Sequence, residues 1–165
     1  MFHYHRFCTL LLFICSLMLL PGCGQQGPPV NPVGGIVTLD GQPVANASIS
    51  FTPVQGSGSG DMSDPLVSGG NTDADGKYTL TAVRGGVIGG GTTVGKYNVT
   101  IIKKELLNAP SGPGQQMVGR PRFHYVVPQV FESESTSNVQ VEVVKGKNVF
   151  NFALTSTGTC EITQQ

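Results

Sequence analysis

Hydrophobic and polar positions alternate in two stretches near the middle of this 165-residue chain. The first stretch, residues 77–82, directly follows the sequence Asp73-Ala74-Asp75-Gly76, and the second covers residues 95–101. Their hydrophobic positions are, in order, Tyr78, Leu80 and Ala82, and then Tyr97, Val99 and Ile101. A period of two predicts β-strands, and we expect the two to be neighbouring strands of a β-sandwich. The Asp-x-Asp-Gly sequence predicts a turn that sets the register of the strand after it.

The same alternation, with turn residues between the segments, continues through most of the chain. Further strands are predicted at residues 33–39, 45–52, 123–127, 139–143 and 150–154, and a short strand starts at 66–67. Asp40-Gly41 ends the first strand as a tight turn, and Lys145-Gly146-Lys147 is expected to join the last two strands as a hairpin. No stretch keeps a helical period for several turns. About seven short strands separated by turns predict an all-β fold, a β-sandwich.

Two connections lack the alternation. Residues 55–63 are rich in glycine and serine and are too poor in apolar residues to pack. The longer connection, 104–122, holds one predicted helical turn at 105–107, followed by several prolines and glycines. Connections of this length are usually either functional or disordered. The segment 104–122, in which Arg120 and Arg122 flank a proline, is therefore the candidate binding loop.

The first 22 residues have the pattern of a signal peptide. One basic side chain, Arg6, precedes residues 7–20, which are mainly apolar and carry no charge. This run is shorter than the about 20 apolar residues that a membrane-spanning helix needs. The sequence Leu20-Pro21-Gly22-Cys23 follows, so cleavage is expected between Gly22 and Cys23.

A small residue directly before a cysteine, after an apolar run, resembles the lipobox of bacterial lipoproteins. The resemblance implies that the Cys23 thiol receives a diacylglycerol and becomes the new N-terminus, although Pro21 departs from the small or β-branched residue usual in the family. It also implies a location in the bacterial cell envelope, and Gly24 in place of aspartate favours the outer membrane. Two alternatives stay open, which are a secreted protein cleaved near the same place and an uncleaved anchor.

These patterns divide the chain into four parts. Residues 1–22 are the signal peptide, and 23–33 are the lipidated cysteine with a proline- and glycine-rich tether. Residues 34–155 are the β-sandwich, and 156–165 are a polar tail. The part after the signal peptide has the length of one domain that can bury its own core.

The charge of the chain bears on whether it binds nucleic acid, and its cysteines bear on whether it forms disulfides. Once Arg6 has left with the signal peptide, nine basic residues stand against ten acidic ones. A chain with this balance lacks the basic stripe that binds phosphates, so nucleic acid is not expected as a partner. Cys8 and Cys15 leave with the signal peptide and lipid uses Cys23, so no intrachain disulfide is expected. Cys160 is then either a free thiol on a loose tail or one half of a bond between chains.

Four segments together resemble the carboxypeptidase regulatory-like domain, a transthyretin-like (prealbumin-like) β-sandwich, especially as found in small planctomycete lipoproteins. They are VTLDGQPVANASISFTP at 37–53, TDADGKYTL at 72–80, VGKYNVTI at 94–101 and VEVVKGKNVFNFAL at 141–154. The resemblance covers roughly residues 34–154, apart from the two connections without alternation. It implies a domain that stands beside catalytic or receptor domains and is not itself catalytic.

No arrangement in the sequence predicts a catalytic, cofactor or metal site. Asp73-Ala74-Asp75-Gly76 is similar to the start of an EF-hand calcium loop, but Ala82 stands where a bidentate acid is needed. Residues 90–97 are close to a phosphate-binding loop, yet a strand follows where the mechanism requires a helix N-terminus. His124 is the one histidine after the signal peptide, whereas a catalytic zinc ion needs about three protein ligands.

The sequence therefore predicts a non-catalytic, lipid-anchored β-sandwich of the cell envelope with a structural or binding role and no cofactor. Its expected partners are the membrane, through the lipid anchor, and an envelope protein or glycan. The alternative of another class is a ligand- or protein-binding accessory or carrier module that uses the loop 104–122.

Overall fold

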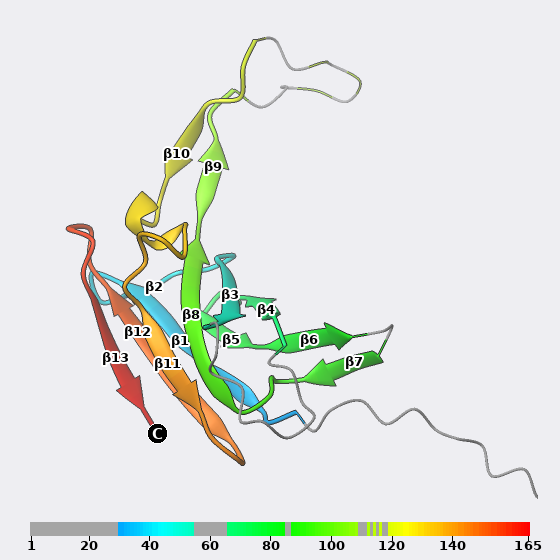
Figure 1. Ribbon diagram of the computed structural model, residues 1–165. Coiled ribbons are helices and arrows are strands. Elements are labelled where there is room, and N and C mark those ends of the chain that lie inside the picture. Colours follow the sequence, from blue (N-terminus) through cyan, green and yellow to red (C-terminus); the bar gives the residue numbers. More distant parts are fainter. Residues whose placement is uncertain are drawn as a thin grey trace, which may run out of the picture.

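The computed structural model describes residues 30–54, 66–84, 87–108, 112, 114, 116 and 119–165 (Figure 1). Within these ranges the chain forms thirteen β-strands and one short 3-10 helix, η1, at Gln129–Phe131. The strands make a five-stranded sheet, a six-stranded sheet and a separate two-stranded ribbon. The predicted all-β sandwich is confirmed. The strand number exceeds the predicted about seven, because short strand pairs also form within the connections.

The five-stranded sheet is built around the first strand, which has neighbours on both sides. Its members are β1 (Val33–Leu39), β2 (Gln42–Pro43), β5 (Lys77–Thr79), β12 (Asn148–Leu154) and β13 (Cys160–Gln164). The order is β13-β12-β1, and β2 and β5 both pair with the other side of β1. The pairing of β1 with β12 is parallel, with Val33 opposite Asn148 and Leu39 opposite Leu154. The remaining pairs of this sheet are antiparallel.

The six-stranded sheet is antiparallel throughout. Its members are β3 (Ser48–Pro53), β4 (Ser68–Asn71), β6 (Thr81–Arg84), β7 (Val87–Gly90), β8 (Gly95–Ile102) and β11 (Gln140–Val143). They follow the order β11-β8-β3-β4-β6-β7. The ribbon consists of β9 (Lys104–Leu106) and β10 (Phe123–Tyr125).

The hydrophobic core lies between the two large sheets, and aromatic rings fill its centre. The ring of Phe51 on β3 lies 6.0 Å from that of Tyr97, 6.1 Å from that of Phe150 and 6.3 Å from that of Phe152. These four side chains are at most 1% exposed. Because β3 and β8 belong to one sheet and β12 to the other, the rings hold the two layers together.

The predicted alternation identifies the buried face correctly. The hydrophobic positions of the two opening stretches are all buried, and Ala47, Ile49 and Phe51 of the segment 45–52 are buried as well. The expectation that the two opening stretches are neighbours is wrong. The first stretch is divided between β5, which pairs with β1 in one sheet, and the start of β6, which pairs with β4 and β7 in the other. β8 pairs with β3 and β11, so neither part of the first stretch pairs with it. Alternation reports which face of a strand meets the core, and two strands can share that core from opposite layers.

The turns predicted at Asp40-Gly41 and at Asp73-Ala74-Asp75-Gly76 are confirmed. Asp40 and Gly41 have φ values of 48° and 81°, as a two-residue hairpin turn between β1 and β2 requires. The Asp73 Oδ1 atom accepts hydrogen bonds from the backbone N–H groups of Asp75 (2.9 Å) and Lys77 (2.8 Å), and Gly76 has a φ of 73°. The Asp-x-Asp-Gly motif is therefore a turn whose carboxylate caps the backbone.

The hairpin predicted for the last two long strands does not form. β11 pairs with β8 and β12 pairs with β1, so residues 144–147 cross from one sheet to the other. The buried Asn148 side chain holds this crossing. Its Oδ1 atom accepts from the Val144 N–H (3.0 Å), and its Nδ2 group donates to the carbonyls of Val144 (2.8 Å) and Gly146 (2.9 Å). Asn148 therefore occupies backbone groups that a hairpin ladder would have used.

The predicted boundaries of the sandwich, 34–155, are too narrow at both ends. Val33 is 1% exposed, and Asn31 exchanges two backbone hydrogen bonds with Thr92, at 2.6 and 3.0 Å, so the last residues of the predicted tether 23–33 belong to the fold. At the other end, the predicted polar tail 156–165 contains β13, which pairs with β12. β13 lies at the edge of its sheet and its side chains are mostly exposed, so a polar sequence suits it.

Candidate functional site

The ribbon of β9 and β10 stands off the sandwich and continues the direction of β8 (Figure 1). Phe123 pairs with Leu106 and Tyr125 with Lys104. The helical turn predicted at 105–107 is therefore wrong, because this part of the chain is extended. We refer to residues 103–108 together with residues 119–125 as the arm. The arm contains the described residues of the candidate binding loop except 112, 114 and 116.

Lys104 fixes the base of the arm to the sandwich. Its Nζ atom lies 2.7 Å from Glu132 Oε1, just beyond η1. The same ammonium group lies 5.2 Å from the ring centre of Phe123 and 5.8 Å from that of Tyr125. The hydrogen bond to Glu132 raises the pKa of Lys104, so this cation is charged at neutral pH. The contacts orient the aromatic side chains on one face of the arm.

Asn108 closes the outer end of the described arm. Its Nδ2 group donates to the carbonyl of Arg120 (3.0 Å), and its Oδ1 atom accepts from the N–H of Arg122 (2.9 Å). The N–H of Leu107 donates to the carbonyl of Arg122 (2.8 Å). These bonds hold the backbone at both arginines, so their side chains project from a fixed position. Both predicted site residues are exposed at this outer end of the arm.

Apolar side chains are exposed on both faces of the arm. Lys104, Leu106, Phe123 and Tyr125 share one face, because residues directly opposite in an antiparallel pair point the same way. Phe123 is 42% exposed, and Leu107, which alternation places on the other face, is 63% exposed. A two-stranded ribbon has no core of its own to cover such side chains. Exposed apolar side chains beside charged ones are typical of a surface that contacts another molecule.

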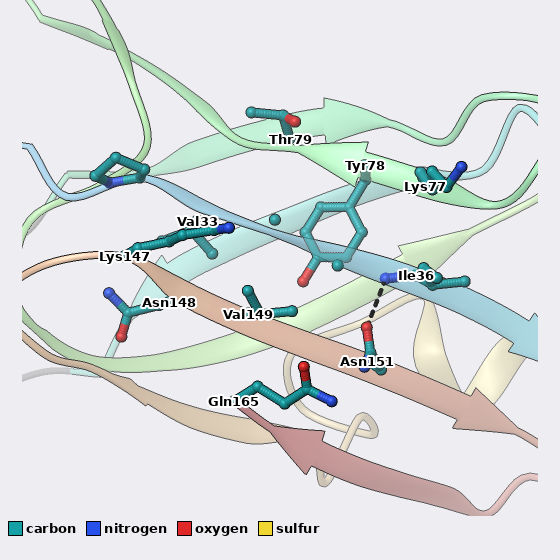
Figure 2. A pocket seen from close by; sticks show the side chains of 13 residues that line it. Val33, Ile36, Lys77, Tyr78, Thr79, Lys147, Asn148, Val149, Asn151 and Gln165 are labelled. Carbon is teal, nitrogen blue, oxygen red and sulfur yellow. Dashed lines mark hydrogen bonds between the residues drawn. The ribbon is translucent and has the colours of Figure 1, made fainter.

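A groove of about 580 Å³ opens where β1, β5 and β12 meet, and it is the second candidate site (Figure 2). Gly34 and Gly35 contribute no side chains there, while Lys77 and Lys147 belong to its lining. Lys77 lies 3.2 Å from the Asp75 carboxylate, so its charge already has a partner.

The polar groups in this groove hold the sheet together. The Tyr78 hydroxyl donates to the carbonyl of Phe150 (2.9 Å), and Asn151 Oδ1 accepts from the N–H of Ile36 (3.0 Å; Figure 2). Burial raises the pKa of Tyr78, so its hydroxyl keeps its proton. The two bonds lie where the register between β1 and β12 skips Gly35 and Ile36. We therefore interpret the groove as part of the framework.

The other sequence-predicted positions are placed as follows. Gly22 and Cys23 lie outside the described residues. His124 is exposed on β10, and the loop similar to a phosphate-binding loop leads into β8. In that loop the hydroxyls of Thr92, Thr93 and Tyr97 bond to one another and to nearby backbone.

In the described part of the chain, no group of three or more His, Cys, Asp or Glu side chains could hold a metal ion, and no helix is long and apolar enough to cross a membrane.

The individual roles of three arm residues are not predicted from the sequence. Leu107 and Asn108 lie in the predicted binding loop, where Leu107 is placed in a helical turn and Asn108 is given no role of its own, and Phe123 is placed in an ordinary strand. The signal that could have found them is the period of two at Phe123 and Tyr125, matched by Lys104 and Leu106 across the connection. Both runs are too short for the pattern to stand out without the pairing.

Cys160 has a free thiol that is partly buried against the core, and it lies on β13 rather than on a loose tail. Burial raises its pKa to about 11. We expect a disulfide reagent such as DTNB to react much more slowly with the native protein than with the denatured one at pH 8, because the thiolate is the nucleophile. Equal rates would contradict the burial of this thiol.

The same shift predicts a pH dependence of stability. In the unfolded chain the thiol ionises near pH 8.5, as roughly expected for free cysteine. The contribution of the neutral Cys160 thiol to the free energy of unfolding is thus complete below that pH. It decreases as the pH rises toward the folded pKa of about 11. Urea unfolding across this range should show a smaller alkaline decrease in Cys160→Ser than in the unchanged protein.

No family model, no curated protein and no solved structure matches this chain. The resemblance to the carboxypeptidase regulatory-like domain therefore stays an expectation from the quoted segments, and the sandwich itself rests on the strand pairing described above.

Proposed function

We propose that this protein is a non-catalytic, lipid-anchored β-sandwich of the bacterial cell envelope that binds another envelope component through its arm. The observation that carries the binding role is the exposure of Leu107, Phe123 and two arginines on a ribbon that stands off the sandwich. A rigid scaffold that presents a protruding hairpin is a common arrangement for a binding surface. This proposal joins the structural role and the binding module that the sequence left as alternatives.

The anchor is supported by the sequence at residues 1–23. A lipid on Cys23 would contribute about 0.8 kcal/mol for each buried CH₂ group, and two or more acyl chains hold a protein stably on a membrane. The proline- and glycine-rich tether would then connect the lipid to the sandwich. The residue after Cys23 is Gly24 and not aspartate, so we favour the outer membrane as the site of the anchor.

A non-catalytic role agrees with how the polar side chains of the sandwich are used. Thr72 is buried, and its hydroxyl donates to the Val44 carbonyl (2.6 Å) and accepts from the Ala47 N–H (2.8 Å). The Ser137 hydroxyl donates to the carbonyl of Val99. These hydroxyls are bonded to backbone, not to a base that could activate them as nucleophiles.

The Cys23→Ser substitution tests the anchor. Without the thiol no diacylglycerol can be attached, so we expect the protein to move from the membrane fraction to the soluble fraction after cell lysis and ultracentrifugation. A Cys160→Ser variant, which keeps the lipid site, should stay with the membranes. If Cys23→Ser still sediments with membranes, the lipid anchor is wrong.

The arm is tested by comparing two pairs of apolar substitutions. Leu107→Ser with Phe123→Ser should reduce the recovery of cross-linked partners from detergent-solubilised envelopes by about tenfold, because exposed apolar anchors dominate binding energy. Val144→Ser with Ile162→Ser changes comparably exposed aliphatic side chains away from the arm and should leave recovery unchanged. Quantitative mass spectrometry of the captured proteins and glycans gives the comparison. If both pairs capture the same partners equally, the arm is not the binding surface.

A further inference from the structure

The arm and the entry of the chain lie at opposite ends of the sandwich. Asn31, where the chain joins the fold, pairs with Thr92 just before β8 begins at Gly95. The arm begins directly after β8 ends at Ile102. The eight residues of β8 separate the two ends by roughly 25 Å. With the lipid at Cys23, the arm would point away from the membrane that holds the anchor.

Positive charge is concentrated in this arm. Residues 103–125 contain four basic residues and one acidic residue, although the whole chain has ten of each. The basic residues are Lys103, Lys104, Arg120 and Arg122, and the acidic residue is Glu105.

The two lysines and the two arginines differ in what they contact. Lys103 Nζ donates to the carbonyl of Ala45 (2.6 Å), and Lys104 pairs with Glu132. Both cations are thus used inside the protein. Arg120 and Arg122 have no acidic partner among the described residues, and their backbone is held by Asn108. Two such guanidinium groups on a fixed backbone fit carboxylates, with which arginine forms paired hydrogen bonds.

The edge of β10 offers backbone groups next to these arginines. Leu107 bonds to Arg122 and Val126 to Lys103 across the ribbon, and in an antiparallel pair such bonded positions alternate with positions whose backbone faces outward. The outward positions on β10 are Phe123 and Tyr125. Within the described chain β10 pairs with β9 alone, so its other edge is open to a further strand.

We propose that the arm binds an extended acidic segment of another protein, which adds as a strand to the edge of β10. The carboxylates of the segment would bond to Arg120 and Arg122, and its apolar side chains, on the other face of the added strand, would cover Phe123. This inference rests on the proposed binding role of the arm and names the chemistry of its partner. The position of the arm, away from the anchored end, leaves it free to meet a partner on the side opposite the lipid.

A fluorescent peptide that alternates glutamate with leucine tests the proposal on the full-length protein in detergent micelles. We expect fluorescence anisotropy to show binding that is about tenfold tighter than for the same peptide with glutamine, because charged hydrogen bonds are the stronger ones. Binding should weaken at high salt. A glutamate peptide with every backbone amide N-methylated keeps its charge but can donate no backbone hydrogen bond to the edge of β10, so it should bind at least about tenfold more weakly.

Matched variants locate the site. Arg120→Ala with Arg122→Ala should weaken binding of the glutamate peptide by about tenfold or more. Lys145→Ala with Lys147→Ala removes two exposed charges beside the crossing between the sheets and should leave binding within about twofold. Melting curves of both variants report whether the fold is intact.

Several outcomes would overturn the inference. They are equal binding of the glutamate and glutamine peptides, equal binding of the N-methylated peptide, or no effect of the arginine substitutions. Phosphatidylglycerol vesicles and polygalacturonate are the comparison probes. If either binds more tightly than the glutamate peptide, and the arginine substitutions weaken that binding, the partner of the arm is a membrane or a glycan and not a peptide. If the peptide fails while capture through Leu107 and Phe123 persists, the inference falls and the proposed binding role stands.

Discussion

Replacing Phe152 with alanine is expected to lower the free energy of unfolding by about 3–5 kcal/mol. Phe152 is 1% exposed, and its ring lies 6.3 Å from that of Phe51 at a near-perpendicular angle of 75°. It also lies 6.1 Å from the ring of Tyr78. The substitution removes apolar surface and leaves a cavity between the sheets that the rigid rings cannot fill.

Equilibrium urea unfolding followed by circular dichroism measures this loss. Val144→Ala is the control, because Val144 is 50% exposed and its truncation should change the free energy of unfolding by no more than about 0.5 kcal/mol. A loss below about 1 kcal/mol for Phe152→Ala would mean that β12 does not place this ring in the core.

Gly35→Ala should destabilise the protein by about 3 kcal/mol or more, although it adds only one methyl group. A Cβ atom at this position would overlap the backbone carbonyl of Phe150 and come within 3.2 Å of Asn151 Oδ1. The Phe150 carbonyl also accepts the Tyr78 hydroxyl, so it cannot move without breaking that bond. β1 and β12 would therefore have to separate at the centre of their sheet.

Gly90→Ala is the matched control for this glycine. Gly90 lies on β7, where an added Cβ atom would meet nothing within 4 Å, so its unfolding free energy should change by about 0.5 kcal/mol at most. The midpoints of thermal unfolding of the two variants can be compared directly. Similar midpoints for Gly35→Ala and Gly90→Ala would contradict the close approach of β1 to β12.

The buried faces could be predicted because alternation is a local property. Tyr97, Val99 and Ile101 lie two residues apart, and each is at most 1% exposed. The turn at Asp40-Gly41 could be predicted for the same reason, since both φ values are set by adjacent residues. These features require no knowledge of distant residues.

Strand pairing could not be predicted in this way. The segments around Val141 and Phe150 are close in sequence, yet they belong to different sheets, and the Asn148 side chain bonds to the backbone of the turn between them. Similarly, residues 160–164 are polar, and only their pairing with β12 makes them a strand. The strand pairing within the arm was not predicted because β9 has three residues, too few for a period to be recognised, and its partner β10 begins only at Phe123, beyond a long connection.

The parallel pairing of β1 with β12 bears on when the domain can fold. Ile36 and Asn151 are separated by 115 residues in sequence and share a hydrogen bond. The first strand therefore has its long partner only after nearly the whole chain has been synthesised, and contacts of such separation make folding slow. While the chain grows, the pair of β1 with β12 cannot form until β12 has been synthesised, and an incompletely folded chain is the state in which a polypeptide can be threaded through a narrow secretion channel. The topology of the sandwich and the leader expected at its N-terminus are thus suited to the same order of events, with export first and folding afterwards.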